Sequence, residues 1–538
     1  MGGTYLVLLL MASFCLWTSA DVTLTQTRFK AAVYGHRVIP PPPGIVSRAD
    51  AVRYMRRNLH VFATQAAEAK AQGADILVFP EDGIYGTQFT RESVYNFLEQ
   101  IPKPLASAWS PCGDPSLHQN TEVLHDLSCI ARNNSLYLVA NMGDKQPCNV
   151  RTDPKCPKDG RYQYNTNVAF DPNGTLVARY HKYHLFFEEQ FDTPNAEVVY
   201  FDTPFGRFGL MVCFDVLFSE PGLSIVLKHH IANIVFPTAW MDALPLLSAV
   251  GFHSSFARAL GVNFLAANFH APERRMHGSG VYSPDGMKTF YYGSSAESPP
   301  ELLVAELDTL SEPKPNINIS AYDSYQKLLE PNCLGFKNDD VVKLSSEEFI
   351  SELFHDMFTF RQLQGGSGRL RVCQNSICCN LNFSLDGDRP GSDLFAFGAF
   401  DGLHTYEGQY YFQICALVKC ADVTDRKTCG TVTDTSTTKF VNISITAEMS
   451  TPFIYPQLVL SDGKGELLLA NSTTWGFKDA TLWTNNQPEG AILSAALFGR
   501  YYQRDNCPSE GPNIFISYLQ TVFSLISAAV AAYIFPIF

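Results

Sequence analysis

The chain has 538 residues, enough for several domains at roughly 150 residues each. Hydrophobic residues make up 46% and charged residues 17%, so the composition excludes a mainly disordered chain and argues against a coiled coil. With 40 basic against 53 acidic residues the formal net charge is −13, and a chain this acidic repels phosphate backbones. We therefore expect no nucleic-acid partner.

The first 20 residues have the pattern of a secretory signal peptide. An apolar run from Tyr5 to Trp17 precedes the small residues 18–20 (TSA), which suit cleavage. The positive charge that usually precedes such a run is absent, and a buried N-terminal helix is the alternative. The abrupt change to polar sequence at Asp21 favours a mature chain that starts near that residue.

Residues 514–538 carry no charge and are numerous enough to span a bilayer. No Lys or Arg follows them to fix an orientation, and a polar stretch precedes them, as in a glycosylphosphatidylinositol (GPI) signal. A retained membrane helix is the alternative. We expect a lipid anchor attached within residues 505–511, with Ser509 preferred, and an enzyme on the extracellular face of the plasma membrane. Free secretion is the alternative location.

Six N-x-S/T sequons agree with export and predict glycosylation. Each one alone is a weak signal, but together with the two terminal segments they are coherent. The asparagines are Asn133, Asn173, Asn318, Asn382, Asn442 and Asn471.

The cysteines predict disulfides and one free thiol. Cys15 leaves with the signal peptide, and the remaining 13 of the 14 cysteines are odd in number. Cys213 is the natural odd one out, because no other cysteine lies within 50 residues of it. The vicinal pair Cys378–Cys379 is expected to bond to two separate partners. No clean zinc spacing occurs, so we expect no metal and no organic cofactor.

Residues 25–310 alternate between strand and helix patterns and predict one layered α/β domain. Two short strands, at 29–34 and 76–79, flank an amphipathic helix that is capped at Ser47 and has apolar residues at steps of 3 and 4 from Val52 to Ala69. The later expected elements are strands at 136–141, 208–215 (ending at Cys213), 232–240, 263–269 and 302–308, a hairpin over 165–182 and a helix over 244–260.

The pattern changes near residue 340. Residues 311–340 are predicted to be a linker, and residues 341–505 a smaller β-rich domain, because strands become short and cysteines cluster there.

Three polar residues stand at the ends of apolar strands, where α/β sheets place their functional crevices. They are Glu81, Lys182 and Cys213. Singly, each has a more ordinary explanation: a turn for Glu81, a surface position for Lys182 and an inert core thiol for Cys213. The ordered trio and the unpaired thiol favour a catalytic set instead.

This set suits acyl transfer. The thiolate is the nucleophile, so Cys213 needs a base, and a glutamate in an apolar pocket can accept its proton and pass it to a leaving amine. Lys182 favours the thiolate and faces the oxyanion of the tetrahedral intermediate. The backbone N–H of Phe214 is the second expected oxyanion donor.

The sequence resembles the nitrilase (carbon–nitrogen hydrolase) superfamily. The motifs are FPEDGIYG (79–86), VCFDVLF (212–218), FPTAWM (236–241) and the whole of residues 160–191. Residues 397–420 (FGAFDGLHTYEGQYYFQICALVKC) and the GRYQYNTN motif are similar to the vertebrate vanin and biotinidase branch. The resemblance therefore covers nearly the whole mature chain.

The resemblance implies a four-layer α-β-β-α sandwich followed by the smaller β-rich domain. It also implies Glu81 as general base, Lys182 on the oxyanion side and Cys213 as nucleophile. A further glutamate of the family matches Glu188 best, and its neighbour Glu189 is the alternative.

For the substrate, the resemblance implies a small-molecule amide. Pantetheine, cleaved to pantothenate and cysteamine, is favoured by LSAVGFHSSFA (247–257) and by the anchor signal. Biocytin, cleaved to biotin and lysine, is the alternative, and Cys333 favours it. An inactive cell-surface binding protein is a further alternative, which the complete trio makes the weaker one.

Overall fold

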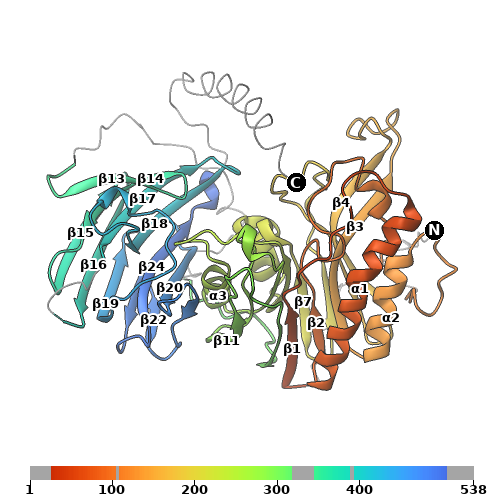
Figure 1. The fold of residues 1–538 in the computed structure, drawn as a ribbon, viewed down its shortest axis with the longest axis horizontal. Helices are drawn as coiled ribbons and strands as arrows, with labels where there is room; N and C mark the ends of the chain where they lie inside the picture. Colours follow the sequence, from red (N-terminus) through yellow and green to blue (C-terminus); the bar gives the residue numbers. More distant parts are fainter. Residues whose placement is uncertain (1–25, 105–107, 318–343, 388–392, 506–538) are drawn as a thin grey trace, which may run out of the picture.

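Two six-stranded sheets form the centre of the N-terminal half (Figure 1). The computed structural model describes residues 26–104, 108–317, 344–387 and 393–505. In each sheet three central strands run parallel: β1, β2 and β3 in the first, and β7, β8 and β9 in the second. The first sheet has the order β12 (Leu302–Asp308), β1 (Arg28–Tyr34), β2 (Ile76–Val78), β3 (Tyr137–Pro147), β4 (Arg161–Phe170) and β5 (Leu176–His181). The second has the order β11 (Gly286–Tyr291), β10 (Ser279–Ser283), β9 (Asn263–Asn268), β8 (Asn233–Thr238), β7 (Gly206–Leu210) and β6 (Tyr200–Thr203).

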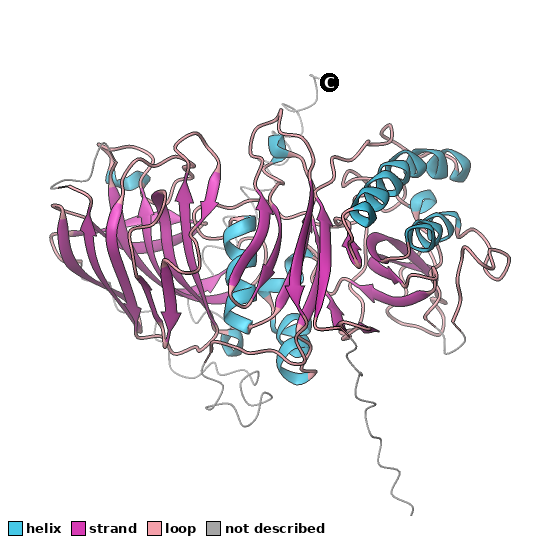
Figure 2. Cartoon of the chain, turned by 90° about the horizontal axis from the view of Figure 1, so that it is seen from below, coloured by secondary structure: helices cyan, strands magenta, loops and turns pink. Residues whose placement is uncertain are grey.

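The two sheets face each other, and helices cover their outer sides. Strands β1 to β3 contact β8 and β9 through apolar side chains, which explains why these strands are uninterrupted apolar runs. Helices α1 (Arg48–Ala71) and α2 (Glu122–Asn134) pack on the outer face of the first sheet, and α3 (Ala249–Leu260) packs on β10 and β11 of the second (Figure 2). The expected four-layer α-β-β-α arrangement is confirmed.

The helix predicted from the apolar stripe is α1. Its N-cap is Ser47, whose hydroxyl accepts a hydrogen bond from the Asp50 N–H at 3.1 Å. The helix ends at Ala71, and Gly73 follows with φ at +84°, a conformation that costs glycine little.

Two sequence predictions in this half are wrong in their bounds. The strand expected to reach Cys213 stops at Leu210, because Cys213 has φ at +42° and begins a five-residue 3₁₀ turn, η2 (Cys213–Leu217). The helix expected from Leu244 begins only at Ala249, where the Ser248 hydroxyl caps it through the Gly251 N–H. The apolar composition of both segments conceals these breaks.

The C-terminal half is a sandwich of two mostly antiparallel sheets, as its β-rich pattern predicts. The larger has the order β13 (Glu348–Leu353), β14 (Asp356–Gln362), β17 (Phe395–His404), β18 (Tyr410–Lys419), β24 (Ala491–Arg500), β20 (Ile454–Ser461) and β21 (Leu467–Leu469). The smaller has the order β15 (Ser367–Gln374), β16 (Ile377–Leu385), β19 (Phe440–Ala447), β23 (Thr481–Thr484) and β22 (Trp475–Lys478). One apolar cluster fills the space between them.

Helix α3 also contacts this second half. Phe252 and Phe256 place their rings 5.7 and 5.9 Å from the ring of Tyr455 on β20, and Phe252 lies 5.6 Å from Phe498 on β24. One helix thus covers sheets of both halves (Figure 1).

Within the described residues, five disulfides join ten cysteines: Cys112–Cys129, Cys148–Cys156, Cys373–Cys378, Cys379–Cys415 and Cys420–Cys429. The expectation that Cys378 and Cys379 have separate partners is confirmed. Among the described residues Cys213 is the free thiol, as its isolation in the sequence predicts.

Several predictions concern residues outside the described ranges. These are the signal peptide (1–20), most of the linker, Asn318, Cys333, Cys507, Ser509 and the hydrophobic tail (514–538). Within the described ranges, no helix is both long and apolar enough to cross a membrane.

Candidate active site

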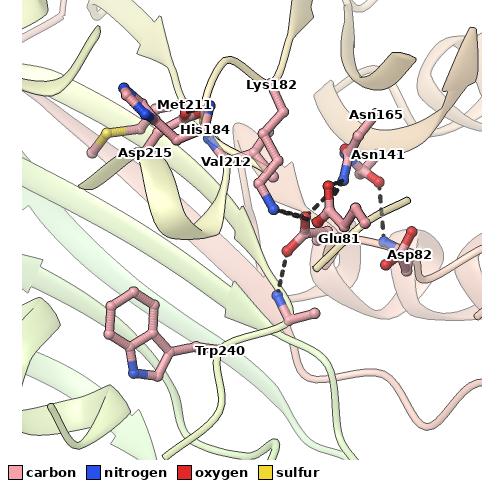
Figure 3. A network of polar contacts seen from close by, with 12 residues as sticks. Glu81, Asp82, Asn141, Asn165, Lys182, His184, Met211, Val212, Asp215 and Trp240 are labelled. Atoms are coloured by element: carbon pink, nitrogen blue, oxygen red, sulfur yellow. Dashed lines mark hydrogen bonds and ion pairs between the residues drawn. The ribbon is translucent and has the colours of Figure 1, made fainter. Parts of the chain in front are cut away.

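Glu81 lies three residues beyond β2, with 1% of its surface exposed, and its carboxylate is surrounded by donors (Figure 3). Its Oε1 accepts from Lys182 Nζ at 2.8 Å and from Asn165 Nδ2 at 2.7 Å. Its Oε2 accepts from the backbone N–H of Ala239 at 2.8 Å. Charge-assisted hydrogen bonds of this kind hold a carboxylate in one orientation.

Lys182 follows β5 directly and is fully buried between two carboxylates. Its Nζ lies 2.8 Å from Glu81 and 2.5 Å from Oε1 of Glu188. Burial opposes the charge on Lys182, but Glu188 and Glu81 outweigh that effect and raise the pKa of Lys182 well above its usual range. Of the two candidate glutamates, Glu188 is the one in contact with Lys182, whereas Glu189 is exposed to solvent.

The site holds more negative charge than Lys182 can neutralise. Burial, together with the neighbouring charge of Glu81, raises the pKa of Glu188 above its ordinary value, although Lys182 opposes the shift. Two buried carboxylates beside one ammonium therefore favour a proton on one of them.

Cys213 is the first residue of η2, buried, and in the left-handed region at φ +42°. Burial, followed by the charge of Glu81, raises the pKa of its thiol well above the usual range, and Lys182 acts in the opposite direction. Both groups therefore lie close enough to Cys213 to act on it electrostatically. A thiol in this environment keeps its proton until a base removes it.

Asp215 ties the Cys213 turn to the strand that carries Lys182. Its carboxylate accepts from the Val212 N–H at 3.0 Å, the Tyr180 hydroxyl at 2.8 Å and the His184 N–H at 2.8 Å. Burial raises the pKa of Asp215 to about 6 even though these donors oppose the shift.

A row of asparagines fixes Glu81 from the other side. Asn141 donates to Asn165 at 2.6 Å and to Asn167 at 3.1 Å, and it accepts from the Asp82 N–H at 3.0 Å (Figure 3). Asn165 thereby keeps its own amide group directed at Glu81. We did not predict these residues or Ala239 as members of the site. The signal was present, because Asn165 and Ala239 belong to the motifs GRYQYNTN and FPTAWM.

Cys213 opens into a cavity of about 580 Å³ between the two halves of the chain. Apolar side chains of the N-terminal half, among them Phe186, Trp240 and Leu244, form part of its lining. The C-terminal half contributes a second wall with Glu352, Phe354, His355, Tyr406, Glu407 and Lys427. Tyr406 and Glu407 belong to the motif at 397–420, but we did not predict that this motif reaches the site. A separate cavity of about 680 Å³, which opens around Arg179 and His181, does not contain Cys213.

The two histidines beside Lys182 are engaged elsewhere. His181 pairs with Asp144 at 2.8 Å, and His184 donates to the Glu220 carbonyl at 2.8 Å while its ring stacks on Phe218. The described contacts of both histidines are therefore with groups other than Cys213.

Comparison with known proteins agrees with this site. Residues 53–252 match the Carbon-nitrogen hydrolase family and residues 347–505 match the Vanin C-terminal domain. Pantetheinase of Bos taurus is 44% identical over 89% of this chain and 91% of that protein. Pantetheinase of Homo sapiens is 43% identical over 89% and 90%, and biotinidase of Mus musculus 40% over 88% and 93%. The chain belongs to the vanin and biotinidase branch of the carbon–nitrogen hydrolases. As a carbon–nitrogen hydrolase it cleaves amides.

Among solved structures, an amidase from Nesterenkonia sp. is 20% identical with a TM-score of 0.38, over 57% of this chain and 95% of that chain. At that score the similarity adds nothing to the assignment.

Proposed function

We propose that this carbon–nitrogen hydrolase cleaves pantetheine to pantothenate and cysteamine, with Cys213 as nucleophile, Glu81 as general base and Lys182 as oxyanion partner. The observation that carries the proposal is that the buried free thiol of Cys213 opens into the cavity, while Glu81 and Lys182, joined at 2.8 Å, lie close enough to act on it electrostatically. No metal or organic cofactor takes part in the proposed steps.

In the acylation step, Glu81 takes the proton from Cys213 as sulfur attacks the amide carbonyl. The negative oxygen that forms is stabilised by the Lys182 ammonium and by the backbone N–H of Phe214. Glu81 then gives its proton to the nitrogen, the C–N bond breaks, and the amine leaves. A thioester between the acyl group and Cys213 remains.

In the deacylation step, Glu81 takes a proton from water as the water oxygen attacks the thioester. The same oxyanion donors serve again, and the sulfur leaves and regains its proton from Glu81. Glu188 holds the Lys182 ammonium in place throughout, because its Oε1 accepts a hydrogen bond from Nζ at 2.5 Å.

The choice of pantetheine over biocytin is supported by the relatives. Those named pantetheinase are 43–44% identical to this chain, against 40% for biotinidase of Mus musculus. Both substrates present a secondary amide to the same chemistry, so biocytin is the second candidate. The cavity of about 580 Å³ falls within the usual range of small-molecule sites and accommodates either type of acyl group.

The deciding experiment gives one purified preparation both substrates and measures the release of pantothenate and of biotin. We expect pantothenate release to dominate and to disappear in Cys213→Ala, while the melting temperature of that variant stays close to the parent's. Dominant biotin release would establish the second candidate. Turnover by folded Cys213→Ala at the parent rate would contradict the assignment of the nucleophile.

We also propose that the enzyme is a glycoprotein held on the outer cell surface by a GPI anchor. The five sequon asparagines in the described ranges are all exposed, as glycosylation requires: Asn133, Asn173, Asn382, Asn442 and Asn471. The anchor itself rests on the sequence of residues 505–538. Treatment of intact cells with a phosphatidylinositol-specific phospholipase should release the enzyme. Retention of the enzyme, detectable with an antibody against the tail, would contradict the anchor.

A further inference from the structure

Arg500, the last residue of β24, has the largest fully buried side chain in the described part of the structure. Asp505 binds its guanidinium through two contacts, at 3.1 Å from Nη1 and 2.7 Å from Nη2. Nη1 also donates to the Tyr411 carbonyl at 2.7 Å. A buried guanidinium fixed in this way presents its Nε–H in a defined direction.

That donor reaches into the other half of the chain. Nε of Arg500 donates to the backbone carbonyl of Leu217 at 2.8 Å. Leu217 is the last residue of η2, whose first residue is Cys213. Carbonyls at the end of a helical turn lack a partner within the turn, and Arg500 supplies one here.

The aromatic neighbours of Arg500 contact the same turn. Tyr410 lies under the guanidinium, 5.4 Å from its central carbon, and places its ring 6.0 Å from Phe214 and 5.7 Å from Phe218. Phe214, the second residue of η2, and Phe218, which follows the turn, thus both pack on the C-terminal half. On the N-terminal side Asp215 holds the turn through Val212 and Tyr180.

We propose that Arg500 is a positioning residue for the nucleophile: through the Leu217 carbonyl it holds the turn that presents the Cys213 thiol and the Phe214 N–H. A left-handed non-glycine residue such as Cys213 persists only where its surroundings fix it. The proposal rests on Cys213 being the nucleophile. It makes the C-terminal half part of the catalytic apparatus.

The test compares Arg500→Lys with the control Asp505→Asn in the full-length enzyme. Lysine keeps the charge but cannot reproduce the planar fork, whereas Asp505→Asn weakens the ion pair and leaves the Nε–Leu217 contact in place. In Arg500→Lys we expect kcat for pantetheine to fall about 10²-fold at an almost unchanged KM, as for a displaced nucleophile. Asp505→Asn should lower the melting temperature yet keep most of kcat.

Alkylation of Cys213 by iodoacetamide is measured across pH in the same variants. In Arg500→Lys its pH dependence should move toward that of a free cysteine, because the thiol leaves its buried position. This measurement needs no substrate, so it stays informative if pantetheine is not the substrate. The proposal would be overturned if folded Arg500→Lys kept both the alkylation profile and the kcat of the parent enzyme. It would also be overturned if Arg500→Lys and Asp505→Asn lost kcat to the same extent.

If Arg500→Lys does not fold, the double variant Arg500→Met/Asp505→Leu replaces both members of the ion pair with apolar residues. Proteins often tolerate such a replacement of a complete buried ion pair. It removes the donor to Leu217 without leaving an unpaired charge. We expect the same loss of kcat and the same change in alkylation. Parent values for both would overturn the proposal.

Discussion

The backbone N–H of Ala239 donates to Oε2 of Glu81 at 2.8 Å, although the two residues are 158 positions apart and follow strands of different sheets. Oε1 accepts from Lys182 and Asn165. A carboxylate has about four positions for accepting hydrogen bonds, so these three donors leave one position, on Oε2. We propose that this position receives the proton from the thiol of Cys213.

The first prediction concerns the proton acceptor. Glu81→Gln keeps the shape of the side chain but removes the basic oxygen and turns an amide NH₂ toward donors. We expect kcat to fall by at least about 10²-fold, the scale of one general base. Lys182→Met, which removes an oxyanion partner, should cost at least as much. Steady-state kinetics on folded protein checks both, and effects confined to KM would instead indicate substrate binding.

The second prediction separates the two adjacent glutamates. Glu188→Gln removes a carboxylate that lies 2.5 Å from Lys182, whereas Glu189→Gln changes an exposed residue. We expect a loss of about tenfold or more in kcat for Glu188→Gln, as for a group that supports a catalytic charge. Glu189→Gln is the matched control and should keep the parent kcat. Equal behaviour of the two variants would remove Glu188 from the proposed site.

The third prediction uses Asn165, whose amide donates to Glu81 at 2.7 Å. Asn165→Asp puts a negative charge where a donor stood and repels the Glu81 carboxylate, which then loses its fixed orientation. We expect kcat at neutral pH to fall about tenfold or more, as for a misplaced catalytic group. Asn165→Leu, which removes the donor without adding charge, is the comparison and should lose less. A parent kcat in folded Asn165→Asp would contradict a role of Asn165 in holding Glu81.

The fourth prediction concerns stability. His404 is fully buried between two carboxylates, with Nδ1 2.8 Å from Asp356 and Nε2 2.8 Å from Glu407. Burial lowers its pKa, but these hydrogen bonds outweigh burial and raise the pKa to about 9. A folded-state pKa above the unfolded value stabilises the protein at low pH. This contribution is complete below about pH 6.5 and is lost as the pH rises through about 9.

The loss should amount to at most about 3 kcal/mol in the free energy of unfolding. Urea unfolding at several pH values across this window measures it. His404→Gln should have a lower free energy of unfolding at pH 6.5 and a much flatter dependence on pH up to about 9. A parent curve that is flat across this window would contradict the prediction.

The sequence predicted the features of this molecule that depend on residues close together in the chain. The apolar stripe of α1 and its cap at Ser47 can be recognised within one short segment of sequence. The distance of Cys213 from every other cysteine in the sequence identified it as the free thiol. The strand before Cys213 was predicted too long, because an apolar run looks the same whether it continues or turns at a residue with positive φ. The Ala239 contact and the wall formed by Glu352 and Tyr406 depend on pairings between distant segments, which no single window of sequence contains.

Helix α3 has a face for each half of the chain, since Phe252 and Phe256 pack on Tyr455 and Phe498 while its other side covers β10 and β11. Production of either half alone would therefore leave a surface lined by aromatic rings exposed to solvent. Exposed aromatic patches of this kind lead to aggregation. We therefore expect neither half to stay monomeric in solution when it is produced alone, although the two halves match two separate families.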